Sequence, residues 1–159
     1  GVYHRGNLAT TEVADWDRVF DVNAKGVFLG SKAVLSQMQK QGKGSIVSIS
    51  SIAGIIGSKQ SVAYNSAKGA IRLFTKSVAV QYAEQGIRAN TIHPGPMVTE
   101  MLDDLFTTKE ESERRREGIP LGRFATVRDV SLGALFLSSD EASLITGSEL
   151  VIDGGWTAQ

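Results

Sequence analysis

Apolar residues recur at helical spacing in two long segments of the chain, residues 11–39 and 61–85. Steps of three and four residues place them on one face of a helix. In the first segment this stripe contains Trp16, Phe20, Asn23, Val27, Gly30, Val34 and Met38. In the second segment it contains Ala67, Ile71, Phe74, Val78 and Tyr82. A second, partly apolar row runs beside each stripe, so we expect both helices to be covered on two sides.

Short segments with β-branched residues predict buried strands at 45–50, 87–93 and 148–152. Strands that alternate with long helices are typical of parallel β-α units. The sequence therefore predicts an α/β fold of about three parallel strands with flanking helices, with the 61–85 helix against one face. Residues 101–117 are polar and predict a solvated helix or mobile flap. Thr126 to Asp129 predicts a capping box before a further helix.

The composition argues against several classes of function. The 159 residues carry no formal net charge, which argues against a nucleic-acid or anionic-membrane partner. No apolar run approaches the ~20 residues of a membrane span, and the N-terminus does not resemble a signal peptide. Since there is no cysteine, we expect no disulfide and no thiolate metal site, and a reducing, cytoplasmic location. His4 and His93 are too few for a metal site, and His93 is interpreted as structural.

Residues 51–68 contain the strongest candidates for catalysis. Tyr64 and Lys68 are four residues apart in a predicted helix, so they share a face. A phenol has a pKa of about 10, and a nearby ammonium group favours its ionised form, which suits proton exchange with an alcohol or carbonyl oxygen. A surface pair without function is the commoner case for this spacing. Ser51 strengthens the catalytic interpretation, because it follows a predicted strand at the end where ligands bind in open α/β sheets.

Two other regions have features suited to a site. Asn23 is a polar residue in an apolar stripe, and its amide is either satisfied within the core or anchors a water that leads toward Lys68. Residues 94–99, Pro-Gly-Pro-Met-Val-Thr, follow the second predicted strand. A fixed proline and a permissive glycine let the backbone approach a planar ring, and Thr99 is able to bond a carboxamide. An ordinary turn from strand to helix is the alternative.

An ordered set of motifs resembles the classical short-chain dehydrogenase/reductase family over nearly the whole chain. The motifs are D-V-N-A-K-G at 21–26, I-V-S-I-S-S-I-A-G at 46–54, Y-N-S-A-K at 64–68, I-R-A-N-T-I-H-P-G at 87–95 and T-G-S-E-L-V-I-D-G-G at 146–155. Together they are far more specific than any one of them. The resemblance implies the C-terminal part of a Rossmann-like doubly wound parallel sheet. Residues 1–159 are then expected to form a partial NAD(P)-binding domain that carries the catalytic residues.

The resemblance also implies a role for each candidate residue. Tyr64 would be the general acid/base, and Lys68 would lower its pKa and bond the nicotinamide ribose. Ser51 would orient the substrate oxygen, and Asn23 would hold a water in a proton relay to Lys68. Residues about 99–120 would cover the substrate. The residues that border the nicotinamide would be Pro94, Gly95, Met97 and Thr99.

The implied activity is hydride transfer between NAD or NADP and a small-molecule alcohol or ketone. Substrate candidates are 3-oxoacyl thioesters, cyclic alcohols, sugars and steroids. Members of the family commonly form homodimers or homotetramers, here through the helices at 11–39 and 61–85.

One departure from the family pattern affects whether this chain can be active as an enzyme by itself. The family begins with a strand and a Gly-rich turn that seats the pyrophosphate, and these residues contain no such motif. We therefore expect the C-terminal portion of an enzyme, with the strand at 45–50 exposed at its edge, and a 159-residue chain that is inactive alone. The alternative is a catalytically incompetent fragment that acts only as a dimerisation or regulatory module.

Overall fold

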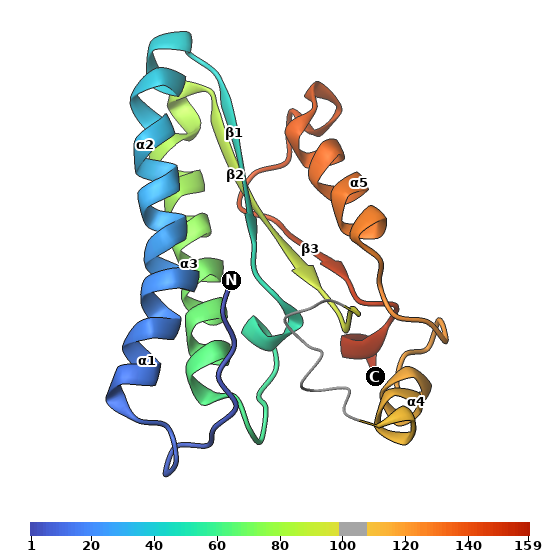
Figure 1. The fold of residues 1–159 in the computed structure, drawn as a ribbon. Coiled ribbons are helices and arrows are strands. Elements are labelled where there is room, and N and C mark those ends of the chain that lie inside the picture. The colour runs from blue at the N-terminus through green and yellow to red at the C-terminus, as the bar shows by residue number, and fades with distance from the viewer. Residues whose placement is uncertain (99–107) are drawn as a thin grey trace.

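The computed structural model describes residues 1–98 and 108–159. Its centre is a parallel sheet in the order β1 (Gly44–Ile49), β2 (Ile87–Pro94) and β3 (Glu149–Ile152), shown in Figure 1. The pairing of β1 with β2 runs from Gly44 opposite Ile87 to Ile49 opposite Ile92. The α/β fold class and the predicted strands are confirmed, with small differences at the strand ends.

The first predicted helix is one helical rod with a π-helical turn in its middle. Its parts are α1 (Val13–Phe20), the π turn (Asp21–Lys25) and α2 (Gly26–Gln41). Gly42 ends it with a φ of 63°, a left-handed conformation that favours glycine. The second predicted helix is α3 (Val62–Tyr82), which continues in a 3-10 turn, Ala83–Gln85.

Two further α-helices follow β2 in the described residues. The polar segment contains α4 (Lys109–Glu117), and the remainder of the prediction for 101–117 lies mostly outside the described residues. The predicted capping box is confirmed: Thr126 and Asp129 cap one another at the start of α5 (Val127–Ser138). None of the helices in the described ranges is long and apolar enough to cross a membrane.

Helices α3 and α5 lie on opposite faces of the sheet. Side chains of successive strand residues point to opposite faces. In β3, Glu149 forms an ion pair with Arg72 of α3, while Leu150 and Ile152 approach Gly133 of α5. As predicted, the 61–85 helix covers one face.

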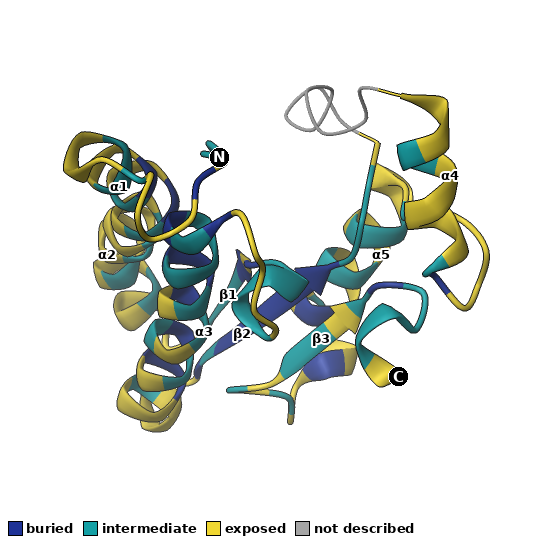
Figure 2. Ribbon diagram, turned by 90° about the horizontal axis from the view of Figure 1, so that it is seen from below, coloured by how far each residue is buried: buried dark blue, intermediate teal, exposed yellow. Residues whose placement is uncertain are grey.

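Burial differs sharply between α2 and α3, as the colours of Figure 2 show. The buried residues of α3 are Ala63, Ala67, Lys68, Ile71, Thr75, Val78 and Ala79, whereas α2 has none. The second apolar rows stay exposed in this chain: Leu29 of α2 and Leu73 and Val80 of α3 are more than half accessible. The expectation that both helices are covered on two sides is therefore not met within the described residues.

Candidate functional site

The turn after β1 rests directly on α3. Ser51 caps a short 3-10 turn, Ile52–Gly54: its Oγ accepts the Ala53 N–H at 3.1 Å, and its carbonyl accepts the Gly54 N–H at 2.9 Å. A Cβ on Gly54 would lie 2.8 Å from the backbone of Lys68, so only glycine lets the turn approach the helix this closely. The Ser50 hydroxyl completes the contact by donating to the Lys68 carbonyl at 2.9 Å.

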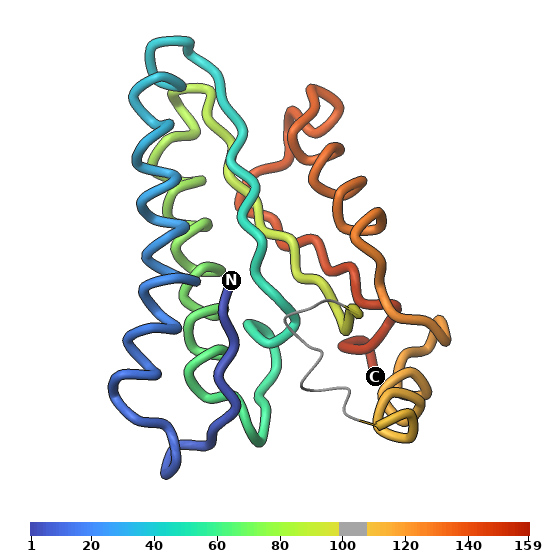
Figure 3. Tube along the Cα trace, in the orientation of Figure 1, coloured from blue at the N-terminus to red at the C-terminus, as the bar shows by residue number. Residues whose placement is uncertain are grey.

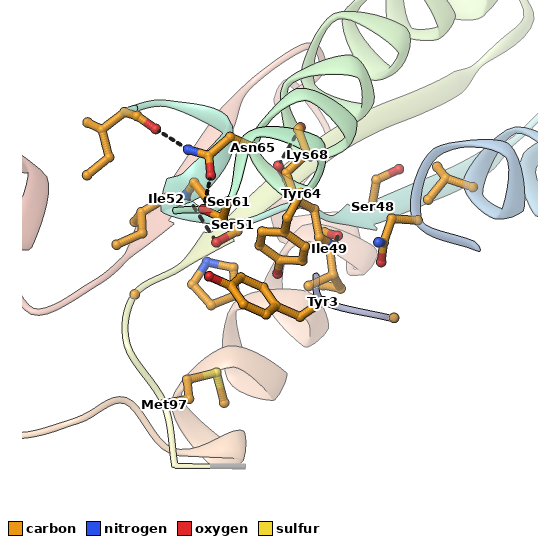
Figure 4. Close-up of a pocket in the computed structure, with 18 of the residues that line it drawn as sticks. Tyr3, Ser48, Ile49, Ser51, Ile52, Ser61, Tyr64, Asn65, Lys68 and Met97 are labelled. Atoms are coloured by element: carbon orange, nitrogen blue, oxygen red, sulfur yellow. Dashed lines mark hydrogen bonds between the residues drawn. The ribbon is translucent and has the colours of Figure 1, made fainter. Parts of the chain in front are cut away.

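The structure brings Ser51, Tyr64 and Lys68 together at the carboxyl end of β1, as Figure 4 shows. The side chains of Tyr64 and Ser51 are hydrogen bonded. Lys68 Nζ donates to the Ile49 carbonyl at 3.0 Å and lies 5.6 Å from the centre of the Tyr64 ring. Residues at the end of one strand and the start of one helix therefore form the group that their spacing predicts.

The pKa values of the two titratable groups shift in opposite directions, and burial is the main cause of both shifts. Burial raises the pKa of Tyr64, and the hydrogen bond from Ser51 offsets part of that rise. Burial lowers the pKa of Lys68 to about 8. The implied lowering of the Tyr64 pKa by Lys68 is therefore absent from this structure, in which the amine binds a backbone carbonyl. A phenolate would need further positive charge nearby.

Asn23 is buried in the π turn, and its amide is satisfied by backbone groups. Its Nδ2 donates to the carbonyls of Val2 at 2.7 Å and Val19 at 3.1 Å, and its Oδ1 accepts the Val2 N–H at 3.2 Å. These contacts fit the first of the two interpretations of Asn23, an amide that is satisfied within the core. The water relay toward Lys68 stays a prediction.

Asn23 also secures the N-terminal residues, which run beside the first turns of α3 in Figure 3. Next to Val2, the ring of Tyr3 packs edge-on against Tyr64, with 5.2 Å between ring centres. Tyr3 lines the cleft and was not a predicted site residue. Residues 1–10 have no periodicity, so no sequence signal marks it.

The turn after β2 is held against β3. The Gly95 N–H donates to the Ile152 carbonyl at 2.9 Å, and a Cβ on Gly95 would lie 2.6 Å from the Asp153 Cα. Pro94, Gly95 and Met97 line the same cleft as Ser51, and their contact with a nicotinamide ring stays a prediction. Thr99, the last residue of that prediction, lies outside the described residues.

The cleft has a volume of about 1170 Å³. Its lining includes apolar side chains, among them Ile52, Ile56, Met97 and Trp156. It continues between α2 and the outer edge of β1, where no other described strand pairs with β1. Its polar end holds a hydroxyl, a phenol and an amine, a set that can bind an alcohol or carbonyl oxygen and exchange a proton with it. No group of acidic, histidine and cysteine residues in the described ranges is suited to hold a metal ion.

Comparisons with known proteins agree with this geometry. A family model described as enoyl-(acyl carrier protein) reductase matches residues 1–157. Cyclopentanol dehydrogenase of Comamonas sp. (strain NCIMB 9872) is 46% identical over 93% of this chain and 59% of its own length. A protein named inactive 2-(S)-hydroxypropyl-CoM dehydrogenase 2, from Xanthobacter autotrophicus, is 41% identical over 99% of this chain and 70% of its own length.

A solved structure gives the same result for the fold. Gluconate 5-dehydrogenase from Burkholderia cenocepacia J2315, in complex with NADP and tartrate, superimposes with a TM-score of 0.97 at 32% identity. The match covers 100% of this chain and 62% of that one. The chain thus spans less than two thirds of cyclopentanol dehydrogenase and of this structure.

Proposed function

The chain belongs to the short-chain dehydrogenase/reductase family, and we propose that it supplies the catalytic part of an NAD(P)-dependent alcohol/carbonyl oxidoreductase. The observation that carries the proposal is the assembly of Ser51, Tyr64 and Lys68 in one cleft. Residues 1–159 would be a partial Rossmann-like domain, and the complete gene product would be the active enzyme. The absence of cysteine is consistent with a cytoplasmic location.

The residues around the cleft fit a nicotinamide and its ribose. The turn at Pro94 and Gly95 lines the cleft, and the missing Cβ of Gly95 lets the turn pack closely against Asp153, which fixes the wall that a planar ring would meet. The Lys68 amine and the Tyr64 phenol can donate hydrogen bonds to ribose hydroxyls. Met97 and, by the family resemblance, Thr99 would border the carboxamide. When bound, the nicotinamide would accept or supply the hydride.

The protein side chains would handle the proton and the substrate oxygen. Ser51 would donate a hydrogen bond to that oxygen and fix its position beside Tyr64. Tyr64 would take the alcohol proton during oxidation and return it during reduction. Because burial raises the pKa of Tyr64, the ionised phenol would depend on the positive charges of Lys68 and of the oxidised cofactor. Asn23 would support the relay that connects Lys68 to solvent.

Cyclic secondary alcohols are the first substrate class to test. The lining of the cleft combines the apolar side chains named above with a hydroxyl, a phenol and an amine, which suits a ring with one oxygen function. Cyclopentanol dehydrogenase also has the highest identity of the relatives described above. Sugar acids, steroids and 3-oxoacyl thioesters form the comparison panel.

A homodimer or homotetramer through the helices at 11–39 and 61–85 is part of the proposal. The exposed apolar residues of these helices, such as Leu29, Leu73 and Val80, support it. Sedimentation of the complete gene product measures the assembly, and a monomer at micromolar concentration would contradict this part.

A non-catalytic dimerisation or regulatory module is the second candidate. The relative from Xanthobacter autotrophicus whose name marks it as inactive is the observation that favours it. The retention of Ser51, Tyr64 and Lys68 together favours the enzyme.

The test compares the complete gene product with its Tyr64→Phe variant. Cyclopentanol and cyclohexanol are supplied with NAD⁺ or NADP⁺, and formation of the reduced cofactor is followed by absorbance. The proposal expects turnover that Tyr64→Phe largely removes. If Tyr64→Phe keeps the turnover of the wild type, the role of Tyr64 is overturned. If the wild type turns over no substrate of the panel, the regulatory module is favoured.

A further inference from the structure

His93 lies under the catalytic turn with both ring nitrogens in contact with polar groups. The residue is fully buried in β2. Its Nδ1 lies 2.9 Å from the Ser51 carbonyl oxygen, and its Nε2 lies 3.1 Å from the Thr91 hydroxyl. A carbonyl oxygen only accepts hydrogen bonds, so Nδ1 must carry a hydrogen and donate it to Ser51. The Thr91 hydroxyl has one hydrogen and lies near two acceptors, Nε2 and the Ser148 carbonyl at 3.3 Å. Donation to the nearer one, Nε2, lets the ring stay neutral.

A cluster of charged residues lies near Nε2 of the His93 ring. Glu149 of β3 places Oε2 3.8 Å from His93 Nε2 and accepts a hydrogen bond from Arg72 at 2.6 Å. Lys76 pairs with the second oxygen of the same carboxylate. These three residues are the charged groups that face the ring, and burial lowers its pKa below the ordinary histidine value.

The partners of Glu149 lie in the same row of α3 as the catalytic pair. Tyr64, Lys68, Arg72 and Lys76 follow one another at steps of four residues, which places them along one side of the helix. Lys68 binds the end of β1, while Arg72 and Lys76 bind the start of β3. His93, on the strand between them, contacts groups from both sides. Side chains of this one row of α3 thus contact the two strands on either side of His93.

We propose that His93 is a positioning residue that sets the location of the Ser51 hydroxyl by donating a hydrogen bond from Nδ1 to the Ser51 carbonyl. This inference rests on the proposed function of Ser51. The Ser51 carbonyl has two donors, His93 and the Gly54 N–H, and the second belongs to the same short turn. Of these two donors, His93 lies on the sheet, and it acts beside the Ser50 N–H, which donates to the Ile92 carbonyl at 2.8 Å. A site residue must be held within about 0.5 Å of its productive place. Loss of the His93 hydrogen bond would therefore lower catalysis by displacing Ser51.

The test uses kinetics of the complete gene product with three variants. His93→Leu removes both ring contacts and is expected to lower kcat about 10-fold while the KM for the cofactor changes less than about 2-fold. His93→Asn keeps a donor near the place of Nδ1 and is expected to restore kcat to within about 3-fold of wild type. Thr91→Val keeps the side-chain shape but removes the hydroxyl on Nε2, with an expected loss of about 3-fold.

Thr75→Val is the matched control. Thr75 is buried in α3, and its hydroxyl has no hydrogen-bond partner among the described residues, so kcat should not change. The positioning role is overturned if His93→Leu keeps the kcat of Thr75→Val, or if His93→Asn is as slow as His93→Leu. If His93→Leu does not fold, His93→Asn and Thr91→Val test the positioning role instead. An unchanged kcat in Thr91→Val together with a 10-fold loss in His93→Asn would then reject it.

Hydrogen exchange separates this inference from the proposed function. The amides of Ala53 and Gly54 both donate to Ser51. Their exchange should be faster in His93→Leu than in Thr75→Val, and close to wild type in His93→Asn. If the wild-type protein oxidises no alcohol, the proposed function fails, and this pattern still decides whether His93 holds the turn. Equal exchange in all variants would reject that contact role.

Discussion

Helices α2 and α3 have similar patterns of apolar residues but very different environments. Helix α3 lies on the sheet and buries a continuous row from Ala63 to Ala79, including the amine of Lys68. Helix α2 contacts the sheet at β1 and buries none of its residues. The comparison shows that periodicity predicts which residues of a helix can be covered, while the neighbouring elements decide which are. Tyr64 and Lys68 lie on the helix that packs against the sheet.

The largest expected effect comes from the phenol on the covered helix. In the complete gene product, Tyr64→Phe should lower kcat about 10³-fold, because proton transfer by a positioned group contributes about that factor. Steady-state kinetics and circular dichroism measure the rate and the fold. Tyr3→Phe is the control, since it keeps the ring that packs on Tyr64. An equal loss of rate in both variants would show that the effect is not specific to the Tyr64 hydroxyl.

Core truncations test the comparison directly in the 159-residue chain. Ile71 is 1% exposed and Leu29 is 52% exposed. Ile71→Ala should lower the free energy of unfolding by about 3 kcal/mol, whereas Leu29→Ala should change it by less than about 0.5 kcal/mol. Urea denaturation measures both. Similar losses would mean that self-association or another contact covers α2 in solution, and repeating the measurement at several concentrations would reveal it.

The buried amine of Lys68 predicts a pH dependence of stability. Its pKa is lowered from 10.5 to about 8 in the folded chain. Between these values the unfolded chain retains a proton that the folded chain has released, so the free energy of unfolding rises with pH, by up to about 3 kcal/mol. The rise should be present in wild type and absent in Lys68→Met. Lys40→Met, an exposed position in α2, should keep it. Parallel pH curves for wild type and Lys68→Met would contradict the buried, deprotonated amine.

Asn23 supplies the smallest of these effects, at the point where α1 joins α2. Asn23→Ala removes its hydrogen bonds to Val2 and Val19 and should cost about 2 kcal/mol of unfolding free energy. Hydrogen exchange of the backbone amides near Tyr3 should be faster, because Val2 loses its hydrogen bonds to Asn23. Gln39→Ala is the exposed control, because the Gln39 side chain donates a hydrogen bond to the exposed Gln85. A stable Asn23→Ala chain with a slowly exchanging N-terminus would show that the packing of Val2 alone is sufficient.

The isolated chain offers a further check. Because no Gly-rich phosphate loop is present in these residues, the 159-residue chain should show no measurable binding of NAD(H) or NADP(H) by calorimetry. Micromolar affinity would contradict the expectation that the chain is inactive alone.

Local patterns predicted the strands, the long helices and the capping box because these features depend on residues close in the chain. They also identified Ser51, Tyr64 and Lys68, whose relative positions follow from one strand end and one helical turn. Interpreting His93 as structural was reasonable for a lone histidine before a proline. The sequence does not show that Nδ1 meets Ser51, because 42 residues separate the partners.

The sequence by itself determined the fold class, the order of the elements and the chemical groups of the site. Tertiary structure alone decided that α3 is covered and α2 is not, that Tyr3 packs on Tyr64 and that Glu149 meets Arg72 and Lys76. It also decided the directions of the pKa shifts of Tyr64 and Lys68. The physical reason is that burial and long-range pairing depend on what other segments bring near a side chain, and desolvation follows from that burial.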